Sequence, residues 1–371
     1  MDERVREHAA VLVEWSARVD PGDDVVVDVA EGAHELAVAA AEQLGEIGAN
    51  VVTTYGSEEF SRAYLRAHDG EFEAGAHELA LIENADVYLR LGGGRNTAAT
   101  ADVESETRQA YSTARQELRE ARMDTDWVST VHPTRSLAQQ AGMAYEAYQS
   151  FVYDAVLRDW ESLAEKMADL KRILDEGSEV RIVTERSDRP DTDIRMSIEG
   201  RTAVNSAASV AYDSHNLPSG EVFTAPADTS GEVFFDVPMT INARRVRNVR
   251  LSFEDGEVVD FAAEQGADIV ESVLDTDDGA GRLGELGIGM NRGIDRVTDN
   301  ILFDEKMGDT VHLALGRAYD ATLPDGESGN ESAVHVDMIT DVSKDSRIEV
   351  DGETVQRNGV FRFEDGFDAE P

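Results

Sequence analysis

The chain has 371 residues, of which 76 are Asp or Glu and 34 are Lys or Arg, so its formal net charge is −42 at pH 7. This large negative charge excludes nucleic acid as a partner, because nucleic-acid binding needs a basic surface. The sequence contains no cysteine, which excludes thiol catalysis, disulfides and cysteine-ligated metal sites.

The acidic residues are spread over the whole chain, and 41% of all residues are hydrophobic, so a folded protein with an acidic surface is predicted. Such a surface is typical of halophilic proteins, because molar salt screens charge repulsion to a range of about 3 Å. An acidic patch for one partner is the alternative, which the even spread disfavours. The charged N-terminus and the short apolar runs predict a soluble, cytoplasmic protein without a signal peptide or membrane span.

The first half of the chain alternates helical and strand patterns. Apolar residues recur at helical spacing over residues 5–19, and residues 33–47 predict a second helix. Short apolar or β-branched runs predict strands at residues 25–30, 49–54, 86–91, 127–131 and 180–184. Strands separated by helices predict an α/β fold whose N-terminal domain is doubly wound and mainly parallel. The helical stretch 145–176 closes this domain, which is assigned to residues 1–176.

After residue 177 the pattern changes to strands joined by turns. Strands are predicted at residues 194–198, 232–236 and 247–253, with helices near residues 268–274 and 301–307. Asp351-Gly352 lies between two alternating segments and predicts a hairpin with a two-residue turn. Residues 177–371 are therefore assigned to a C-terminal mixed α+β domain that binds metal.

The candidate metal ligands all lie in this second domain, and they are Glu221, Glu285, His312, His335 and Asp337. Three carboxylates and two imidazoles suit two divalent cations, whose small excess of positive charge favours a hydrolytic water. His335 and Asp337 are two residues apart in an apolar run, so on a strand both side chains leave the same face. An isolated His-x-Asp more often marks an ordinary strand, but the chain has only 8 histidines.

Other motifs are set aside. Residues 92–96, Gly-Gly-Gly-Arg-Asn, fit neither the dinucleotide fingerprint nor the P-loop, so a strand-to-helix turn is preferred. The His-Glu pairs at residues 34–35 and 77–78 lack the second histidine of a zinc-protease helix. The chain contains no Gly-x-Ser-x-Gly nucleophile elbow.

Four segments carry a resemblance to a known family. They are residues 216–226 (NLPSGEVFTAP), 301–306 (ILFDEK), 310–319 (TVHLALGRAY) and 335–339 (HVDMI). In this order the segments resemble the thermophilic metalloaminopeptidases, the group of aminopeptidases T, S and II, over most of residues 190–340. The resemblance implies a homodimer that uses two cobalt or zinc ions to remove N-terminal amino acids from peptides.

The resemblance also implies roles for single residues. Glu221, Glu285, His312, His335 and Asp337 match the family's metal ligands, and Tyr319 matches its active-site tyrosine. We expect Tyr319 to donate a hydrogen bond to the tetrahedral oxyanion, although it could instead be a packing residue. Glu221 and Glu285 are both candidates for the general base, and the sequence does not choose between them.

Two alternatives stay open at this point. A related metallo-dipeptidase or amidase would keep the metals and change the substrate, and a non-catalytic ligand- or nucleotide-binding protein would use the parallel domain. The acidic loop at residues 323–331 departs from the family, so the family's side-chain preference is not carried over.

Overall fold

The structure is a computed structural model that describes residues 1–241, 244–324 and 326–368. Two compact units can be distinguished. The first combines Met1–Arg158 with Ala208–Pro218, and the second combines Asp159–Ala207 with the described chain from Ser219 onward. From the sequence the division is placed at residue 176, whereas in the structure residues 159–176 pack within the second unit. Among the described residues, no helix has both the length and the apolar character that a membrane-crossing helix needs.

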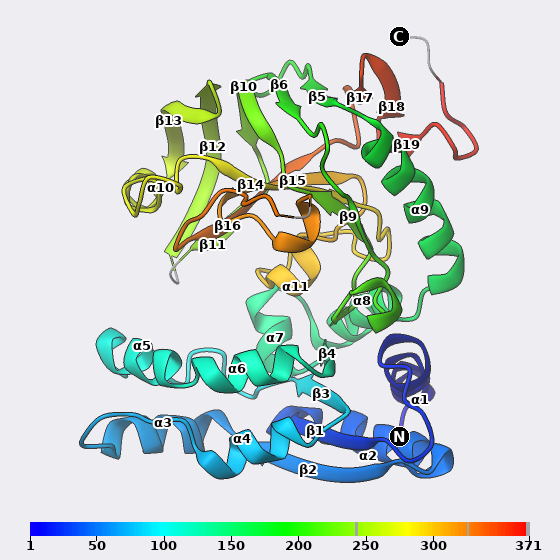
Figure 1. Ribbon diagram of the computed structural model, residues 1–371, viewed down its shortest axis with the longest axis vertical. Helices are drawn as coiled ribbons and strands as arrows, with labels where there is room; N and C mark the ends of the chain where they lie inside the picture. Colours follow the sequence, from blue (N-terminus) through cyan, green and yellow to red (C-terminus); the bar gives the residue numbers. More distant parts are fainter. Residues whose placement is uncertain (242–243, 325, 369–371) are drawn as a thin grey trace. The chain divides into compact units, whose positions relative to one another are not determined.

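The first unit is built on a five-stranded sheet in the order β2-β1-β3-β4-β8, and every neighbouring pair is parallel. Figure 1 labels β1, β2, β3 and β4 of this sheet. Its strands are β1 (Asp24–Ala30), β2 (Asn50–Gly56), β3 (Val87–Gly92), β4 (Asp126–Val131) and β8 (Asn216–Leu217). Its α-helices are α1 (Glu3–Ala10), α2 (His34–Ile47), α3 (Glu58–Ala67), α4 (Ala76–Glu83), α5 (Ser105–Ala114), α6 (Gln116–Met123), α7 (Arg135–Gln140) and α8 (Tyr145–Val156).

The inner strands β1 and β3 of this sheet are buried on both faces, whereas the edge strand β2 is mostly exposed. In β1, Val25 and Val27 point to one face and Val26 to the other, and all three are buried. Val26 packs in one cluster with Ile82 of α4 and Leu118 of α6. Runs of β-branched residues suit a strand that has helices on its faces. The predicted α/β class with a parallel N-terminal sheet is therefore confirmed.

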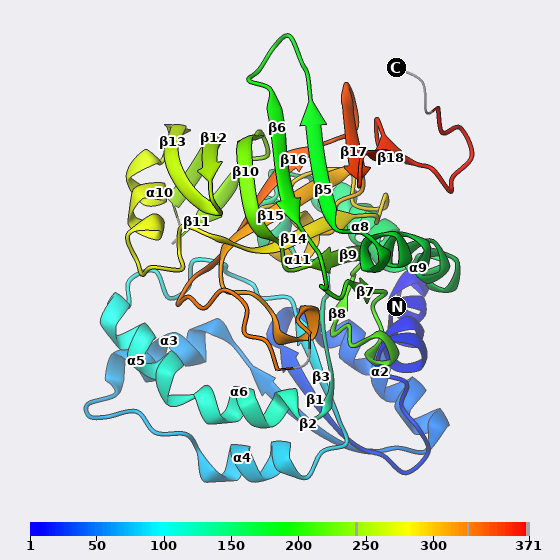
Figure 2. The same ribbon diagram turned by 45° about the horizontal axis from the view of Figure 1, so that its top comes forward.

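The second unit consists mainly of two antiparallel sheets (Figure 2). Its strands are β5 (Glu179–Thr184), β6 (Thr192–Ser197), β7 (Val204–Ser206), β9 (Glu221–Thr224), β10 (Ala227–Phe235), β11 (Met239–Ile241), β12 (Arg244–Glu254), β13 (Glu257–Gln265), β14 (Leu283–Gly289), β15 (Thr310–Gly316), β16 (His335–Asp341), β17 (Ser346–Val350), β18 (Glu353–Arg357) and β19 (Val360–Phe361). Its α-helices are α9 (Trp160–Glu176), α10 (Ala267–Leu274) and α11 (Ile301–Asp304).

The larger sheet has nine strands in the order β11-β12-β10-β6-β5-β17-β18-β19, with β13 also paired to β12. Strand β5 forms antiparallel pairs with β6 and β17, so the predicted strand at residues 180–184 does not belong to the parallel sheet. Asp351 and Gly352 connect β17 to β18 with φ values of 51° and 81°. Positive φ at both turn positions matches the favoured hairpin turn and confirms that prediction.

The smaller sheet has the order β16-β15-β14-β9-β7, and all its pairs are antiparallel. Strands β14 and β15 are buried along their whole length. Figure 2 shows β14, β15 and β16 running next to one another within the second unit. This sheet carries every candidate metal ligand.

Candidate metal centre

The strand register brings the five candidate ligands to one face of the smaller sheet. Ala314 of β15 lies opposite both Glu285 of β14 and Asp337 of β16. Cross-strand partners share a face, and every second residue of a strand returns to that face. The same rule places the remaining candidates there, so the shared face carries Glu221, Glu285, His312, His335 and Asp337.

Three of these side chains come close enough to hold one cation. Glu285, His335 and Asp337 each offer one ligand atom, and these atoms lie within 4.8 Å of one another. His335 Nε2 is 3.4 Å from Asp337 Oδ1 and 4.0 Å from Glu285 Oε2. The strand pattern of His335 and Asp337 was predicted from their spacing, and the structure places both side chains as that spacing requires.

The other two candidates join this group through Glu285. His312 Nε2 is 2.8 Å from Glu285 Oε1 and 3.8 Å from Glu221 Oε2. Glu285 therefore has one carboxylate oxygen toward His312 and the other toward His335. A carboxylate between two imidazoles offers oxygen and nitrogen donors of the kind that divalent cations bind.

Main-chain carbonyls fix the orientation of both imidazoles. His312 Nδ1 donates to the carbonyl of Glu305 at 3.0 Å, and His335 Nδ1 donates to the carbonyl of Arg317 at 2.8 Å. A ring whose Nδ1 is used in this way presents Nε2 to a metal. Both Nε2 atoms point toward the carboxylates, so the two rings are already oriented as ligands.

In the metal-free protein, protons on the two imidazoles balance part of the negative charge of the carboxylates. Burial lowers the pKa of His312, but the hydrogen bond to Glu285 and the charge of Glu221 together raise it to about 10. Burial also lowers the pKa of His335, but Asp337 and Glu285 raise it to about 9. Both imidazoles are therefore charged at neutral pH in the metal-free protein, and metal binding must displace these protons.

Two observations indicate that the group fits divalent cations. Among the described residues, no hydrogen-bond partner reaches the buried Glu221 Oε2 or the buried Asp337 Oδ1, and each has only a longer ion pair, with His312 at 3.8 Å and with His335 at 3.4 Å. Buried carboxylate oxygens without donors are costly unless a cation binds them. In addition, a Cβ at Gly287 would lie 2.0 Å from His312 Cε1, so only glycine leaves room for this ring.

Two charged residues beside the ligands, Glu305 and Lys306, were missed as site residues in the sequence. The Lys306 side chain is 1% exposed, and its Nζ lies 3.4 Å from Glu221 Oε1 and forms an ion pair with Glu305. Burial raises the pKa of Glu305, against the charge of Lys306, to about 7. The sequence feature that could have identified Lys306 as a site residue is the scarcity of lysine. Lys306 is one of only four lysines in the chain, and it follows shortly after the apolar residues 301–303.

Tyr319 lies shortly after β15 and is 46% exposed, which is not the burial of a core packing residue. Its ring centroid is 5.0 Å from that of His335 and 6.1 Å from that of Phe223. Burial of the hydroxyl and the charges of Glu285 and Asp337 raise the pKa of Tyr319. The phenol therefore stays protonated and can donate a hydrogen bond beside the ligand group.

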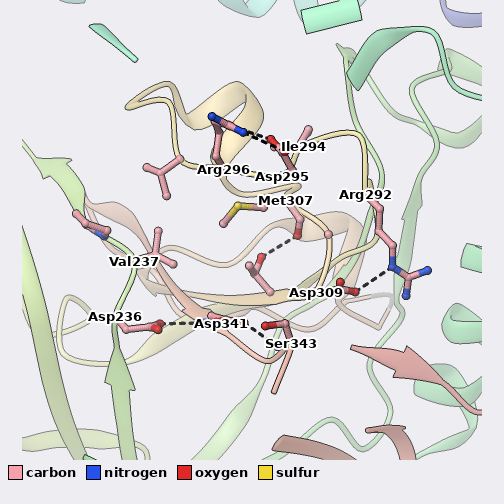
Figure 3. A pocket seen from close by; sticks show the side chains of 14 residues that line it. Asp236, Val237, Arg292, Ile294, Asp295, Arg296, Met307, Asp309, Asp341 and Ser343 are labelled. Atoms are coloured by element: carbon pink, nitrogen blue, oxygen red, sulfur yellow. Dashed lines mark hydrogen bonds and ion pairs between the residues drawn. The ribbon is translucent and has the colours of Figure 1, made fainter. Parts of the chain in front are cut away.

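A neighbouring cavity of about 490 Å³ in the second unit is also rich in acids (Figure 3). Its carboxylates, unlike those of Glu221 and Asp337, have donors. Asp309 accepts from Arg292 Nε at 3.0 Å, Asp236 accepts from the Asp341 N–H at 2.9 Å, and Asp341 pairs with Arg186 at 3.0 Å. Satisfied carboxylates of this kind do not require a cation.

Comparison with known proteins gives a match over nearly the whole chain. The family described as thermophilic metalloprotease (M29) matches residues 1–367. Aminopeptidase 2 of Geobacillus stearothermophilus is 36% identical over 173 residues, which are 40% of each chain. Aminopeptidase AmpS of Bacillus subtilis is 33% identical over 197 residues, 46% of this chain and 47% of that one. The chain therefore spans less than half the length of these curated relatives.

A solved structure is similar over the full length. Wild-type AmpT from Thermus thermophilus has a TM-score of 0.83 and 24% identity, and the match covers 97% of this chain and 99% of that chain. Both chains therefore have the same fold.

Proposed function

Because the chain belongs to the thermophilic metalloprotease family M29, we propose that it is a metal-dependent aminopeptidase that hydrolyses the N-terminal peptide bond of peptides. The observation that carries this proposal is the group of three carboxylates and two oriented imidazoles on one sheet face, with two buried oxygens that lack donors. The names of the similar proteins, aminopeptidases 2 and AmpS, support the same activity.

The residues that would hold two divalent cations, zinc or cobalt, are Glu221, Glu285, His312, His335 and Asp337. Such ions, when bound, supply Lewis acidity that polarises the scissile carbonyl and lowers the pKa of the attacking water. The carbonyl oxygens of residues 305 and 317 keep the two imidazoles in place for this binding.

The other steps belong to side chains of the chain. A carboxylate, Glu221 or Glu285, would take the proton of the attacking water and return it to the leaving amine. The hydroxyl of Tyr319 would donate a hydrogen bond to the carbonyl oxygen as its negative charge grows. A substrate with a free N-terminus brings an ammonium group, which the excess of carboxylates around the site favours. We also infer, from the family resemblance, a cytoplasmic homodimer.

The function can be tested with matched blocked and unblocked substrates. The protein supplied with Zn²⁺ or Co²⁺ is expected to hydrolyse aminoacyl anilides, to lose this activity with a chelator, and to leave N-acetylated aminoacyl anilides intact. Elemental analysis should find divalent metal in the active protein. Equal cleavage of the acetylated substrates would point to an amidase, and a metal-free protein that binds nucleotide would point to a ligand-binding protein.

Replacing Tyr319 with phenylalanine tests the oxyanion role. We expect kcat to fall by about 10²–10³ with little change in KM, because the donor acts mainly in the transition state. Metal content and melting temperature should stay the same, since the ring remains. Tyr64→Phe is the control, because Tyr64 is comparably exposed at 43% but lies in the first unit. Unchanged turnover in Tyr319→Phe would remove the tyrosine from the mechanism.

A further inference from the structure

A second cavity of the second unit reaches the metal-binding group from the side. It has a volume of about 350 Å³ and runs along β16, with His335 and Asp337 in its lining. Strand β16 is the edge strand of the smaller sheet, so one of its sides pairs with β15 and the other side faces this cavity. The cavity thus lies beside the candidate ligands and the edge of β16 at residues 335–337, whereas Val237 already pairs with Ile339 further along this edge.

The main chain of β16 offers hydrogen-bonding groups on the cavity side. The Val334 carbonyl accepts from the N–H of Arg317 at 2.8 Å, so the even-numbered residues face β15. The Ile339 carbonyl accepts from the N–H of Val237 at 3.3 Å, so the odd-numbered residues face away from β15. By this alternation, the main-chain N–H and C=O of Asp337 face away from β15. An extended peptide can add to an edge of this kind as a further strand, here beside residues 335–337, because Val237 and Asp236 already bond Ile339 and Asp341.

Apolar residues make up just over half of the cavity lining. They include Met239 and Ile241 from β11, Ile301 from α11 and Ile339 from β16. A side chain that enters this space removes apolar surface from water, which stabilises the complex by roughly 25 cal/mol for each Å² buried. The lining therefore favours an apolar side chain over a polar one.

Three carboxylates line the cavity: Asp337 belongs to the candidate metal ligands, and neighbouring groups already engage the other two. Asp299 forms an ion pair with Arg245. Asp304 is buried, and its Oδ1 accepts from both the N–H and the hydroxyl of Thr298 at 2.8 Å. These interactions direct the acids toward their own partners, so the cavity is not built to bind a cationic side chain.

The geometry points to this cavity as the binding site for the side chain of the residue that the enzyme removes, with aliphatic residues such as leucine and methionine as the substrate class. The substrate main chain would lie along the edge of β16, which brings its first peptide bond beside His335 and Asp337. This inference rests on the proposed aminopeptidase function and adds a side-chain preference to it.

The test compares leucyl, alanyl and lysyl anilides, whose only amino-acid side chain is that of the removed residue. The unmodified enzyme is expected to have a higher kcat/KM for the leucyl than for the lysyl substrate. Ile301→Asp adds a carboxylate at a wall position that is 51% exposed, where the fold tolerates a charge. We expect the leucyl-to-lysyl ratio of kcat/KM to fall by about tenfold or more, within the range that single pocket changes produce.

Val259→Asp is the matched control, because Val259 is 55% exposed on β13 of the same unit and does not line the cavity. This variant gains the same charge and should keep the ratio of the unmodified enzyme. Met239→Ala provides a second variant, which shortens the wall without adding charge. It should lower kcat/KM for the leucyl substrate by about tenfold relative to the alanyl substrate.

The outcomes separate this inference from the proposed function. If the unmodified protein hydrolyses no aminoacyl anilide, both the proposed function and the cavity assignment are overturned. If the anilides are hydrolysed but neither Ile301→Asp nor Met239→Ala changes the preference, only the cavity assignment is overturned. The cavity assignment alone is also overturned if the unmodified enzyme prefers the lysyl substrate. It is likewise overturned if, with dipeptide substrates, the two variants change only the preference for the second residue.

Discussion

Replacing Lys306 with methionine is expected to destabilise the metal-free protein by about 3–5 kcal/mol, the cost of breaking a buried ion pair on one side. Lys306 is almost fully buried, and its ammonium group is the cation that contacts both Glu221 and Glu305. Methionine fills a similar volume without the charge, so Glu305 would lose its ion pair with Lys306, and Glu221 would keep only the longer contact with His312 at 3.8 Å. The measurement is the thermal melting of the metal-free protein.

A surface lysine provides the control. Lys171 pairs with Asp175 at 2.6 Å on α9, and both side chains are 33% exposed. Lys171→Met should cost only about 0.3–0.5 kcal/mol, as is usual for exposed pairs one helical turn apart. Added Zn²⁺ should restore part of the stability lost in Lys306→Met, because the metal takes over the charge neutralisation of Glu221. Equal melting temperatures for the two variants would contradict the structural role of Lys306.

Replacing Asp337 with alanine should abolish activity and greatly reduce metal content. Asp337 supplies a buried oxygen that has no hydrogen-bond donor, and it lies within the group formed with Glu285 and His335. Loss of a group that merely supports a ligand costs about 10–100-fold in metal affinity, so loss of a ligand itself should cost more. Elemental analysis and titration with Zn²⁺ measure the effect, and circular dichroism checks that the fold persists.

Asp341→Ala is the matched control for this experiment. Asp341 is the last residue of the same strand, but its carboxylate pairs with Arg186 and accepts from the N–H of Ser343. This variant should lose some stability and keep its metal. Full activity in Asp337→Ala would remove β16 from the metal centre, whereas equal metal loss in both variants would trace the effect to the strand as a whole.

Local patterns predicted the parts of the fold that depend on neighbouring residues. The two-residue spacing of His335 and Asp337 indicated a strand, and Asp351-Gly352 indicated the hairpin between β17 and β18, because both patterns reflect the geometry of a few adjacent residues. The stretch 145–176, by contrast, was predicted as one helical segment but contains two helices. Asp159 separates them, since its carboxylate caps α9 by accepting from the N–H of Ser162 at 3.0 Å.

Features that depend on long-range packing could not be derived in this way. The two-residue strand β8 returns to the first unit without any periodicity that would mark it. Lys306 reaches Glu221 across 85 positions of the sequence, a contact that no local pattern encodes. The face shared by the five candidate ligands likewise follows from strand order, which spacing along the chain does not specify.

The distribution of the ligands over four strands has a consequence for the order of events in folding. Apart from His335 and Asp337, the ligands are far apart along the chain, from residue 221 to residue 337, so the unfolded chain offers no assembled chelate. Non-local pairings form slowly because large loops must close first. Cations can then bind tightly only after the ladder from β9 to β16 is complete, and nearly all of their binding free energy stabilises the native chain. If the proposed metal centre forms, a free metal concentration a thousandfold above Kd would contribute about 4.1 kcal/mol by this linkage, so the supply of metal would set the stability of the folded protein as well as the proposed activity.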